Sequence, residues 1–318
     1  ITGYEFDAVN KGNVVLTEMK NDRPTGMDGL VMNSRKKIFQ NPRVREALNY
    51  AYDFEWYNKV LGYNAYTRTN SYFENSPLAS SGLPSEEELK LLNPWKDQLP
   101  IEIFTKTYKS PVSDGSGMPR ENLKIAKQIL EEEGWLIENG KLIKDGEEFV
   151  FEFLIVSPSL EKLALAFQKT LKTLGITMTV RTVDSSQYQA RLLNYDFDMI
   201  NAIWRVSLSP GNEQQFYWGS EVGKEDGSKN YPGIDSPVVD FLIEKLIGAK
   251  TRKELTTTIH ALDRVLLWGH YLIPLHHSGI DRIAYWNFLE FPEQIPLYGI
   301  VIETWWANQE KAKKIKKQ

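Results

Sequence analysis

Residues 149–204 alternate between strand and helix patterns, and this alternation restricts the possible folds more than any other feature of the chain. Residues 149–156 are apolar on both faces of a predicted strand, and apolar residues then recur at helical spacing over 160–174. Residues 176–180 predict a second strand, 184–194 a second helix, and 197–204 a third strand. Two consecutive right-handed crossovers predict three parallel strands covered by helices, which is an α/β fold.

The end of the third strand is a candidate ligand-binding loop. Trp204 and Arg205 stand where the strand ends, and the Ser-Pro-Gly-Asn run at 209–212 breaks regular structure and exposes backbone polar groups. Ligands of α/β proteins bind at the carboxyl ends of strands. The alternative is an ordinary strand and turn with Trp204 as a core residue, and both interpretations stay open.

The remainder of the chain carries weaker but readable patterns. We expect helices from Asn41 and at 86–92, 121–133, 237–246 and 252–268, and short strands at 14–19 and 30–33. Residues 61–119 are rich in Gly, Pro, Ser, Asn and Tyr and, apart from the helix at 86–92, predict a long excursion. Residues 275–318 are strand-like and aromatic.

Composition excludes several classes of protein. The 318 residues suffice for about two domains, and the formal net charge of −4 argues against a nucleic-acid binder. The absence of cysteine excludes disulfides and thiolate metal sites, and no apolar run approaches the roughly 18 residues of a membrane span. The short basic segment 311–318 predicts a solvated helix end. Because the chain begins at Ile1 without a signal peptide, we expect that a segment was removed or never included.

No catalytic, metal or phosphate motif is present in the sequence. The four histidines lack zinc-site spacing, and neither a nucleophile elbow nor a P-loop occurs. Asp196 and Asp198 flank Phe197 and imitate the carboxylate pair of a carbohydrate-active enzyme, but we interpret them as strand-entry residues. We therefore expect no enzyme, no cofactor and no metal.

Aromatic and hydroxyl side chains gather in three places: 66–73, the Trp204 loop and 230–233. Stacking surfaces beside exposed backbone amides suit extended polar ligands such as peptides or sugars. The candidate ligand-binding residues are Trp204, Arg205, Ser207, Ser209, Asn212, Tyr66, Arg68, Tyr72 and Tyr231.

Five ordered blocks resemble one protein family. These blocks are 41–59 with its VREALNYAYD core, 121–135, 174–192, the FDMINAIW strand 197–204, and 233–246. Together they are similar to the C-terminal portion of the dipeptide and oligopeptide receptors of bacterial ABC importers, the extracellular solute-binding proteins of family 5. Segments 66–88 and 207–214 resemble more closely the branch linked to microcin C uptake.

The resemblance implies a periplasmic-binding-protein fold, a clamshell of two lobes. It assigns 40–270 to the ligand-closing second lobe, with the βαβαβ core. Residues 1–39 become hinge-proximal strands of the first lobe, and 271–318 a return segment to it. The N-terminal half of the first lobe is expected to lie outside this chain.

The resemblance also implies roles for individual residues. Trp204 stands where family members keep a ligand-packing tryptophan, and Ser207 stands where many have an aspartate that pairs with the peptide's amino terminus. A hydroxyl cannot supply that charge-assisted bond, which is worth about 1.5–3 kcal/mol, so amine recognition must come from elsewhere. Arg68 and Arg205 are candidates for carboxylate or phosphate groups, with surface ion pairing as the alternative.

The implied function is that of a periplasmic substrate-binding component that delivers short peptides or peptide-like compounds to an ABC permease in the inner membrane. The alternative is a truncated, binding-deficient fragment of such a receptor. Because half a clamshell should leave apolar surface uncovered, we also expect self-association.

Overall fold

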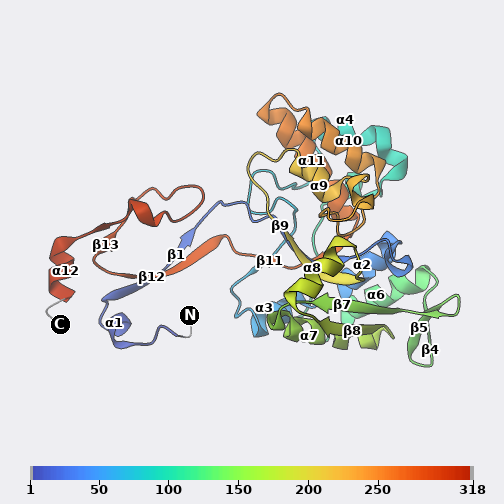
Figure 1. Cartoon of the computed structure of the whole chain (residues 1–318), viewed down its shortest axis with the longest axis horizontal. Helices are drawn as coiled ribbons and strands as arrows, with labels where there is room; N and C mark the ends of the chain where they lie inside the picture. Colours follow the sequence, from blue (N-terminus) through green and yellow to red (C-terminus); the bar gives the residue numbers. More distant parts are fainter. Residues whose placement is uncertain (1–2, 316–318) are drawn as a thin grey trace. The chain divides into compact units, whose positions relative to one another are not determined.

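The computed structural model describes residues 3–315, which divide into two compact units (Figure 1). The larger unit spans Gly26–His277, and the smaller unit combines the described residues before 26 with those from 278 onward. Among the described helices, none is both long and apolar enough for a membrane crossing.

A five-stranded sheet forms the centre of the larger unit, with the strand order β10-β2-β9-β7-β8. The strands β7 (Val150–Ile155), β8 (Thr177–Thr182) and β9 (Met199–Trp204) are parallel, which confirms the predicted strand–helix–strand–helix–strand core. The strands β2 (Met27–Met32) and β10 (Leu272–Pro274) add to it in antiparallel fashion.

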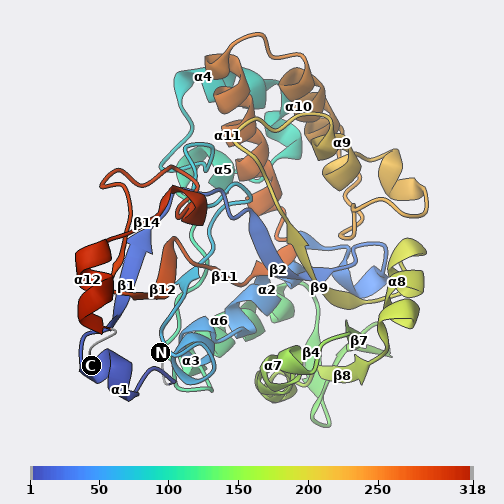
Figure 2. The ribbon, with the colours of Figure 1, turned by 60° about the vertical axis from the view of Figure 1, so that its left-hand side comes forward.

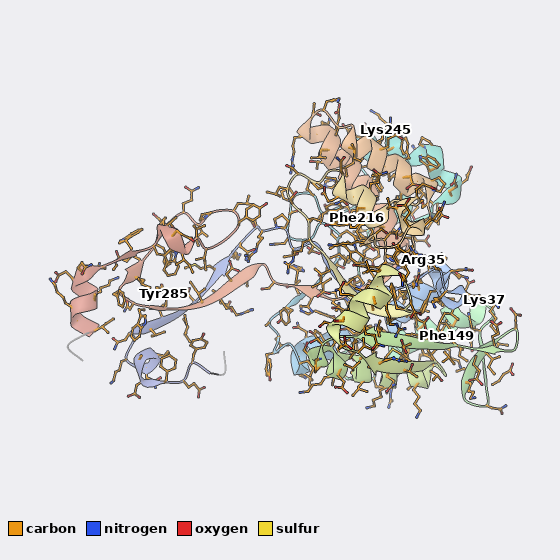
Figure 3. The ribbon with its side chains drawn as sticks, viewed as in Figure 1. Arg35, Lys37, Phe149, Phe216, Lys245 and Tyr285 are labelled. Carbon is orange, nitrogen blue, oxygen red and sulfur yellow. The ribbon has the colours of Figure 1, made fainter. Side chains whose placement is uncertain are left out.

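Each face of this sheet is covered by its own hydrophobic core. On one face, β2 and β9 residues such as Met32 and Met199 pack with α2 (Pro42–Ala51), α6 (Arg120–Glu132) and α7 (Glu161–Thr173). The opposite face packs with α8 (Ser185–Leu193), α10 (Pro237–Ile247) and α11 (Arg252–Trp268). Figure 2 shows α10 and α11 on one side of β2 and β9, and α6 and α7 on the other. Phe149, labelled in Figure 3, is buried in the core with α7.

The helix starts follow from local capping chemistry. Asn41 accepts a hydrogen bond from the Arg43 amide at 2.8 Å, and Pro42 occupies the first helical position of α2. Asp184 caps α8 through bonds from the amides of Ser186 and Gln187, both at 2.9 Å. These caps explain why the predicted starts agree with the structure.

The excursion over 61–119 contains more regular structure than the sequence predicted. Besides the predicted α4 (Glu86–Leu92), it holds β3 (Thr67–Arg68) and α5 (Glu102–Thr105), and α3 (Phe54–Val60) precedes it. These elements are short, so their periodicity is too weak to read from sequence. The remaining short elements of the larger unit are β4 (Leu136–Glu138), β5 (Lys141–Lys144), β6 (Glu147–Glu148), α9 (Glu213–Trp218) and β11 (His276–His277).

The smaller unit is built on an antiparallel ribbon of β1 (Val14–Lys20) and β12 (Ile280–Trp286). Tyr285, labelled in Figure 3, packs with Phe291 and Trp305 at ring-centroid distances of 5.7 and 5.2 Å. The other elements of this unit are α1 (Asp7–Asn10), β13 (Leu289–Glu290), β14 (Trp306–Ala307) and α12 (Gln309–Ile315).

The two compact units divide the chain at other positions than the lobes expected from the resemblance, and the lobe assignment stays a prediction. The sequence placed 1–39 and 271–318 outside the main unit, whereas the structure divides the chain after residues 25 and 277. The physical reason is that β2 and β10 are hydrogen-bonded into the five-stranded sheet, which holds 26–39 and 271–277 in the larger unit.

A buried carboxylate fixes the loop that carries Tyr72. Asp263 of α11 is fully buried and accepts bonds from the Ser71 hydroxyl at 2.8 Å and the Tyr72 amide at 2.7 Å. It also accepts the amide and hydroxyl of Ser80, at 2.9 and 2.7 Å. This single side chain therefore ties both ends of the loop to α11.

We predict that Asp263→Ala lowers the free energy of unfolding by about 3 kcal/mol or more, because it leaves several buried donors without a partner. Asp226→Ala, at an exposed position, is the matched control and should change stability by no more than about 0.5 kcal/mol. Urea unfolding followed by tryptophan fluorescence measures both. Equal effects would contradict the anchoring role of Asp263.

Candidate functional site

The predicted site residues come from segments that meet at the end of the five-stranded sheet where β9 finishes. Met27, at the start of β2, pairs with Trp204, at the end of β9. The chain leaves β10 at the same end, and its strand β11 pairs with β3, so that His276 lies opposite Arg68. The carboxyl end of β9 is thus flanked by two segments distant in sequence.

Gly26 allows the close approach of β2 to β9 at this end of the sheet. Its φ of +71° is a conformation that other residues rarely adopt, and a Cβ there would lie 2.0 Å from the Trp204 carbonyl oxygen. Any other residue would therefore push the two strands apart at the carboxyl end of β9.

Three of the predicted residues join one aromatic cluster. Trp204 lies 4.8 Å from Trp218 and 5.9 Å from Tyr231 between ring centroids, and Tyr72 lies 5.1 Å from Trp218. Trp204 is only 1% exposed, and its indole N–H donates to the Lys229 carbonyl at 3.1 Å. The structure therefore places Trp204 and Tyr72 in the core, and a ligand contact for either stays a prediction.

The loop after β9 presents its polar side chains to solvent. Arg205, Ser207, Ser209 and Asn212 are all exposed. The Ser207 hydroxyl accepts a bond from the Ser209 amide at 3.1 Å, and the Arg252 guanidinium donates to the Leu208 carbonyl. Local bonds therefore hold the backbone of this loop, while its side chains stay available.

The loop that carries Tyr231 is held by an arginine that the sequence did not single out. The Arg35 guanidinium stacks 3.9 Å from the centroid of the Tyr195 ring. It donates to the carbonyls of Gly223, Asn230 and Tyr231. Tyr231 thus gains a fixed position beside Trp204.

Asp28 is a carboxylate at this end of the sheet that sequence reasoning missed. Its Oδ1 accepts a bond from Asn201 Nδ2 at 2.7 Å. Burial raises the pKa of Asp28 from 3.8 to about 6, while the Asn201 bond and the Arg205 charge act in the opposite direction. Asp28 lies inside β2, ahead of the strand expected at 30–33, and no local pattern marked it as a site residue.

Arg68 is buried, with 8% of its surface exposed, and is not the surface ion pair that the sequence left open. Its guanidinium carbon lies 5.1 Å from the centroids of both the Tyr52 and Phe54 rings. Tyr66, by contrast, is 37% exposed, and its ring lies 4.0 Å from that of His276. The predicted aromatic cluster at 66–73 therefore separates into a buried part and an exposed part.

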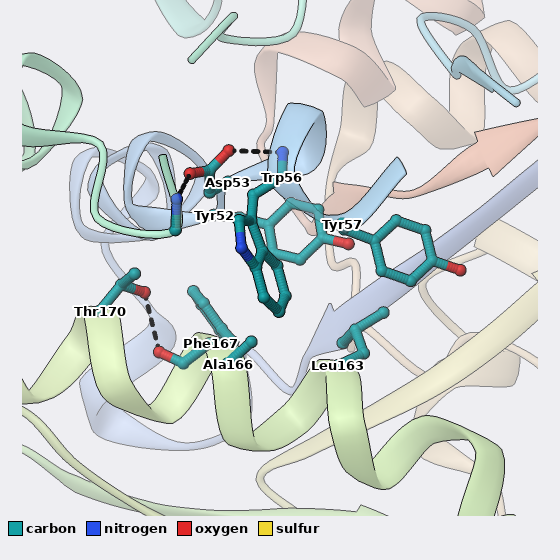
Figure 4. Close-up of a pocket in the computed structure, with 9 residues that line it drawn as sticks. Tyr52, Asp53, Trp56, Tyr57, Leu163, Ala166, Phe167 and Thr170 are labelled. Atoms are coloured by element: carbon teal, nitrogen blue, oxygen red, sulfur yellow. Dashed lines mark hydrogen bonds between the residues drawn. The ribbon is translucent and has the colours of Figure 1, made fainter. Parts of the chain in front are cut away.

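A small cavity is lined by residues of the α2–α3 connection and α3, among them Tyr52 and Tyr57, and by α7 (Figure 4). Its volume of about 20 Å³ has room for about one water molecule, so it cannot hold a peptide. Asp53 borders it and accepts bonds from the amides of Trp56 and Gly117 at 2.9 and 2.8 Å. A second pocket, of about 390 Å³, lies between α9 and α10, and none of the predicted site residues lines either one.

The aspartates considered as a catalytic pair have structural partners. Asp198 accepts the Glu152 amide at 2.9 Å and pairs with Lys36 at 3.4 Å, and Asp196 pairs with Arg191 at 3.0 Å. Within residues 3–315, no group of three or more His, Cys, Asp or Glu side chains is arranged to hold a metal ion.

Comparison with known proteins identifies the family. Residues 4–226 match the family described as bacterial extracellular solute-binding proteins, family 5 middle, and the chain belongs to this family. It is 45% identical over 312 residues to the uncharacterized protein y4wM of Sinorhizobium fredii, covering 96% of this chain and 47% of that protein. It is 43% identical over 314 residues to the probable peptide-binding protein YejA of Agrobacterium fabrum, covering 97% and 51%.

A solved structure shares the fold. The oligopeptide-binding protein AppA of Bacillus subtilis, in complex with a nonapeptide, aligns with a TM-score of 0.66 and 21% identity. The alignment covers 93% of this chain and 52% of AppA. The chain therefore has the fold of the periplasmic binding proteins and spans about half the length of the relatives it matches.

The raised pKa of Asp28 generates a prediction about stability. A buried carboxyl with a raised pKa favours folding while it is neutral, and this contribution is lost as the pH rises through about 6. Asp28→Asn should therefore unfold like the wild type at pH 4 and be more stable at pH 8, by on the order of 2 kcal/mol. Thermal unfolding at both pH values measures the difference. Asp226→Asn is the control, and a constant difference across the pH range would contradict the assignment.

Proposed function

We propose that this chain is the ligand-closing part of the substrate-binding component of an ABC importer. It binds short peptides or peptide-like compounds and delivers them to a permease in the inner membrane. The observation that carries this proposal is membership of the solute-binding family over residues 4–226. The name of the 43% identical relative and the nonapeptide bound by the structural neighbour support peptides as the ligand class.

In this proposal the larger unit is the second lobe, and the smaller unit supplies strands to the first lobe. The end of the sheet at Trp204 forms the wall that the second lobe contributes to the ligand cleft. Trp204 and Tyr231 shape this wall from within, and the exposed Tyr66, Arg205 and Ser207 reach the ligand. Asn212, Ser209 and Tyr72 complete the set of proposed contacts.

Asp28 is the carboxylate best placed to receive a ligand amine in the absence of an aspartate at position 207. It lies beside the carboxyl end of β9, and burial raises its pKa to about 6, so its charge is less well stabilised than that of an exposed carboxylate. A ligand ammonium would stabilise the ionised form and gain a charge-assisted bond. The same chemistry explains how a serine can stand at position 207 without loss of amine recognition.

The protein is proposed to bind its ligand and to close over it without cleaving a bond. It is proposed to do so outside the inner membrane, in the periplasm. The family description, extracellular solute-binding proteins, supports this location. No catalytic residue is proposed.

We predict that the purified chain binds short peptides in isothermal titration calorimetry. The titrants are pooled synthetic tripeptides to pentapeptides, and free amino acids serve as the control. Heat and a saturable isotherm with the peptides alone are expected. No heat with any peptide pool would contradict peptide binding by this chain and would favour the binding-deficient fragment.

We also predict self-association through exposed apolar side chains of the smaller unit. Ile302 is 73% exposed and Trp306 49% exposed, and both can be buried between two copies. Sedimentation velocity should show a concentration-dependent increase in the mean sedimentation coefficient. The double variant Ile302→Lys and Trp306→Lys should shift the chain toward the monomer. A wild-type chain that stays monomeric at every concentration would contradict this expectation.

A further inference from the structure

Arg68 carries a buried charge that has no counter-ion in the part of the chain that the structure describes. Within residues 3–315, none of its three guanidinium nitrogens has a hydrogen-bond partner, and each is shielded from solvent. Burial lowers the pKa of Arg68, which reflects the free energy required to keep the charge in this environment. Buried charges in proteins are almost always paired, so an unpaired guanidinium is costly unless a ligand completes it.

Two further polar atoms near Arg68 also lack partners. The Tyr52 hydroxyl and His276 Nδ1 are buried and make no hydrogen bond within the described part of the chain. Burial lowers the pKa of His276 to about 4, so the ring is neutral at pH 7 and can carry its proton on Nδ1. All three groups can therefore act as donors.

Strand pairing and ring contacts connect these groups into one cluster. Arg68 and His276 are directly opposite in the β3–β11 pair, so their side chains leave the same face. Tyr52 lies beneath Arg68, with its ring centroid 5.1 Å from the guanidinium carbon. The Tyr57 ring lies between the rings of Tyr52 and His276, at centroid distances of 6.5 Å and 5.4 Å respectively.

The two carboxylates that act on the Arg68 charge are already hydrogen-bonded to other groups. Asp53 and Glu55 influence the Arg68 charge only at a distance. Asp53 accepts the amides of Trp56 and Gly117, and Glu55 accepts the amide and hydroxyl of Ser113. Neither carboxylate is bonded to the guanidinium.

We propose that Arg68, the Tyr52 hydroxyl and His276 Nδ1 form a receptor for a carboxylate of the ligand. The guanidinium fork offers two parallel N–H donors to the two oxygens, and the hydroxyl and imidazole occupy the remaining lone pairs. The rings of Tyr52 and Phe54 hold the fork in place. This inference rests on the proposed function, and it names the chemical group that the second lobe recognises.

Tyr66 is the exposed aromatic side chain that contacts this cluster. It lies two residues before Arg68, so both side chains lie on the same face of the β3 segment, and its exposed ring rests on His276. Its backbone is fixed to α3 by paired bonds with the Asn58 side chain, at 2.8 and 3.2 Å. A carboxylate therefore enters by displacing the Tyr66 ring while the backbone stays in place.

The test compares ligands that differ only in the carboxylate. The probes are a pool of short synthetic peptides as free acids, the same pool with amidated carboxyl termini, and amidated peptides that contain one glutamate. Equilibrium dialysis against the wild-type chain should show the free acids binding about 10–100-fold more tightly than the amides. Tight binding of the glutamate amides would assign the receptor to a side-chain carboxylate, whereas weak binding would assign it to the peptide terminus.

Substitutions test whether the preference for free acids over amides depends on Arg68. Arg68→Met should bring the free-acid affinity down to that of the amides and leave the amide affinity unchanged. Arg68→Lys should retain part of the preference, and Tyr52→Phe should reduce it several-fold. Arg181→Met, at an exposed arginine of β8, is the matched control and should behave like the wild type.

Two outcomes would overturn the proposal in distinguishable ways. Equal binding of acids and amides by the wild type would refute the carboxylate receptor and leave the proposed function intact. Absence of binding with every pool would refute the proposed function itself. If Arg68→Met does not fold, the wild-type comparison and Tyr52→Phe still decide the question.

Discussion

The antiparallel pairing of β2 with β9 is the interaction on which the rest of the structure depends. It joins the parallel core at β7–β9 to the segments that leave the larger unit, and it requires Gly26 above the Trp204 carbonyl. Through β10, which pairs with β2 in turn, it also sets the position of β11 and hence of β3. Trp204, Arg68 and His276 therefore depend on this strand contact for their positions. The loops of Tyr231 and Tyr72 depend in addition on Arg35 and Asp263.

The fold was predictable where the signal is local. Periodicity over 149–204 is long and strong, so the crossover helices and parallel strands could be read directly. The insertion of β2 and β10 into the same sheet was not predictable, because it pairs residues separated by more than a hundred positions. No local pattern records such pairing, so the sequence did not place β2 and β10 in one sheet with the parallel core.

The candidate site was likewise predictable only in its local features. The rule for strand ends identified Trp204 and Arg205, and the family resemblance directed attention to Ser207 and Arg68. Neither line of reasoning revealed that Trp204 is buried, or that Arg68 lies beside Tyr52 and His276 without a hydrogen-bond partner among residues 3–315. Burial and hydrogen-bond satisfaction are properties of the assembled fold, so a residue's type cannot report them.

Native mass spectrometry of the freshly purified chain is the sharpest test of the proposed peptide binding. We expect the chain to carry a heterogeneous set of short peptides, which gentle activation releases and tandem sequencing identifies. The bare mass of the polypeptide in every charge state, with no released peptides, would contradict this proposal.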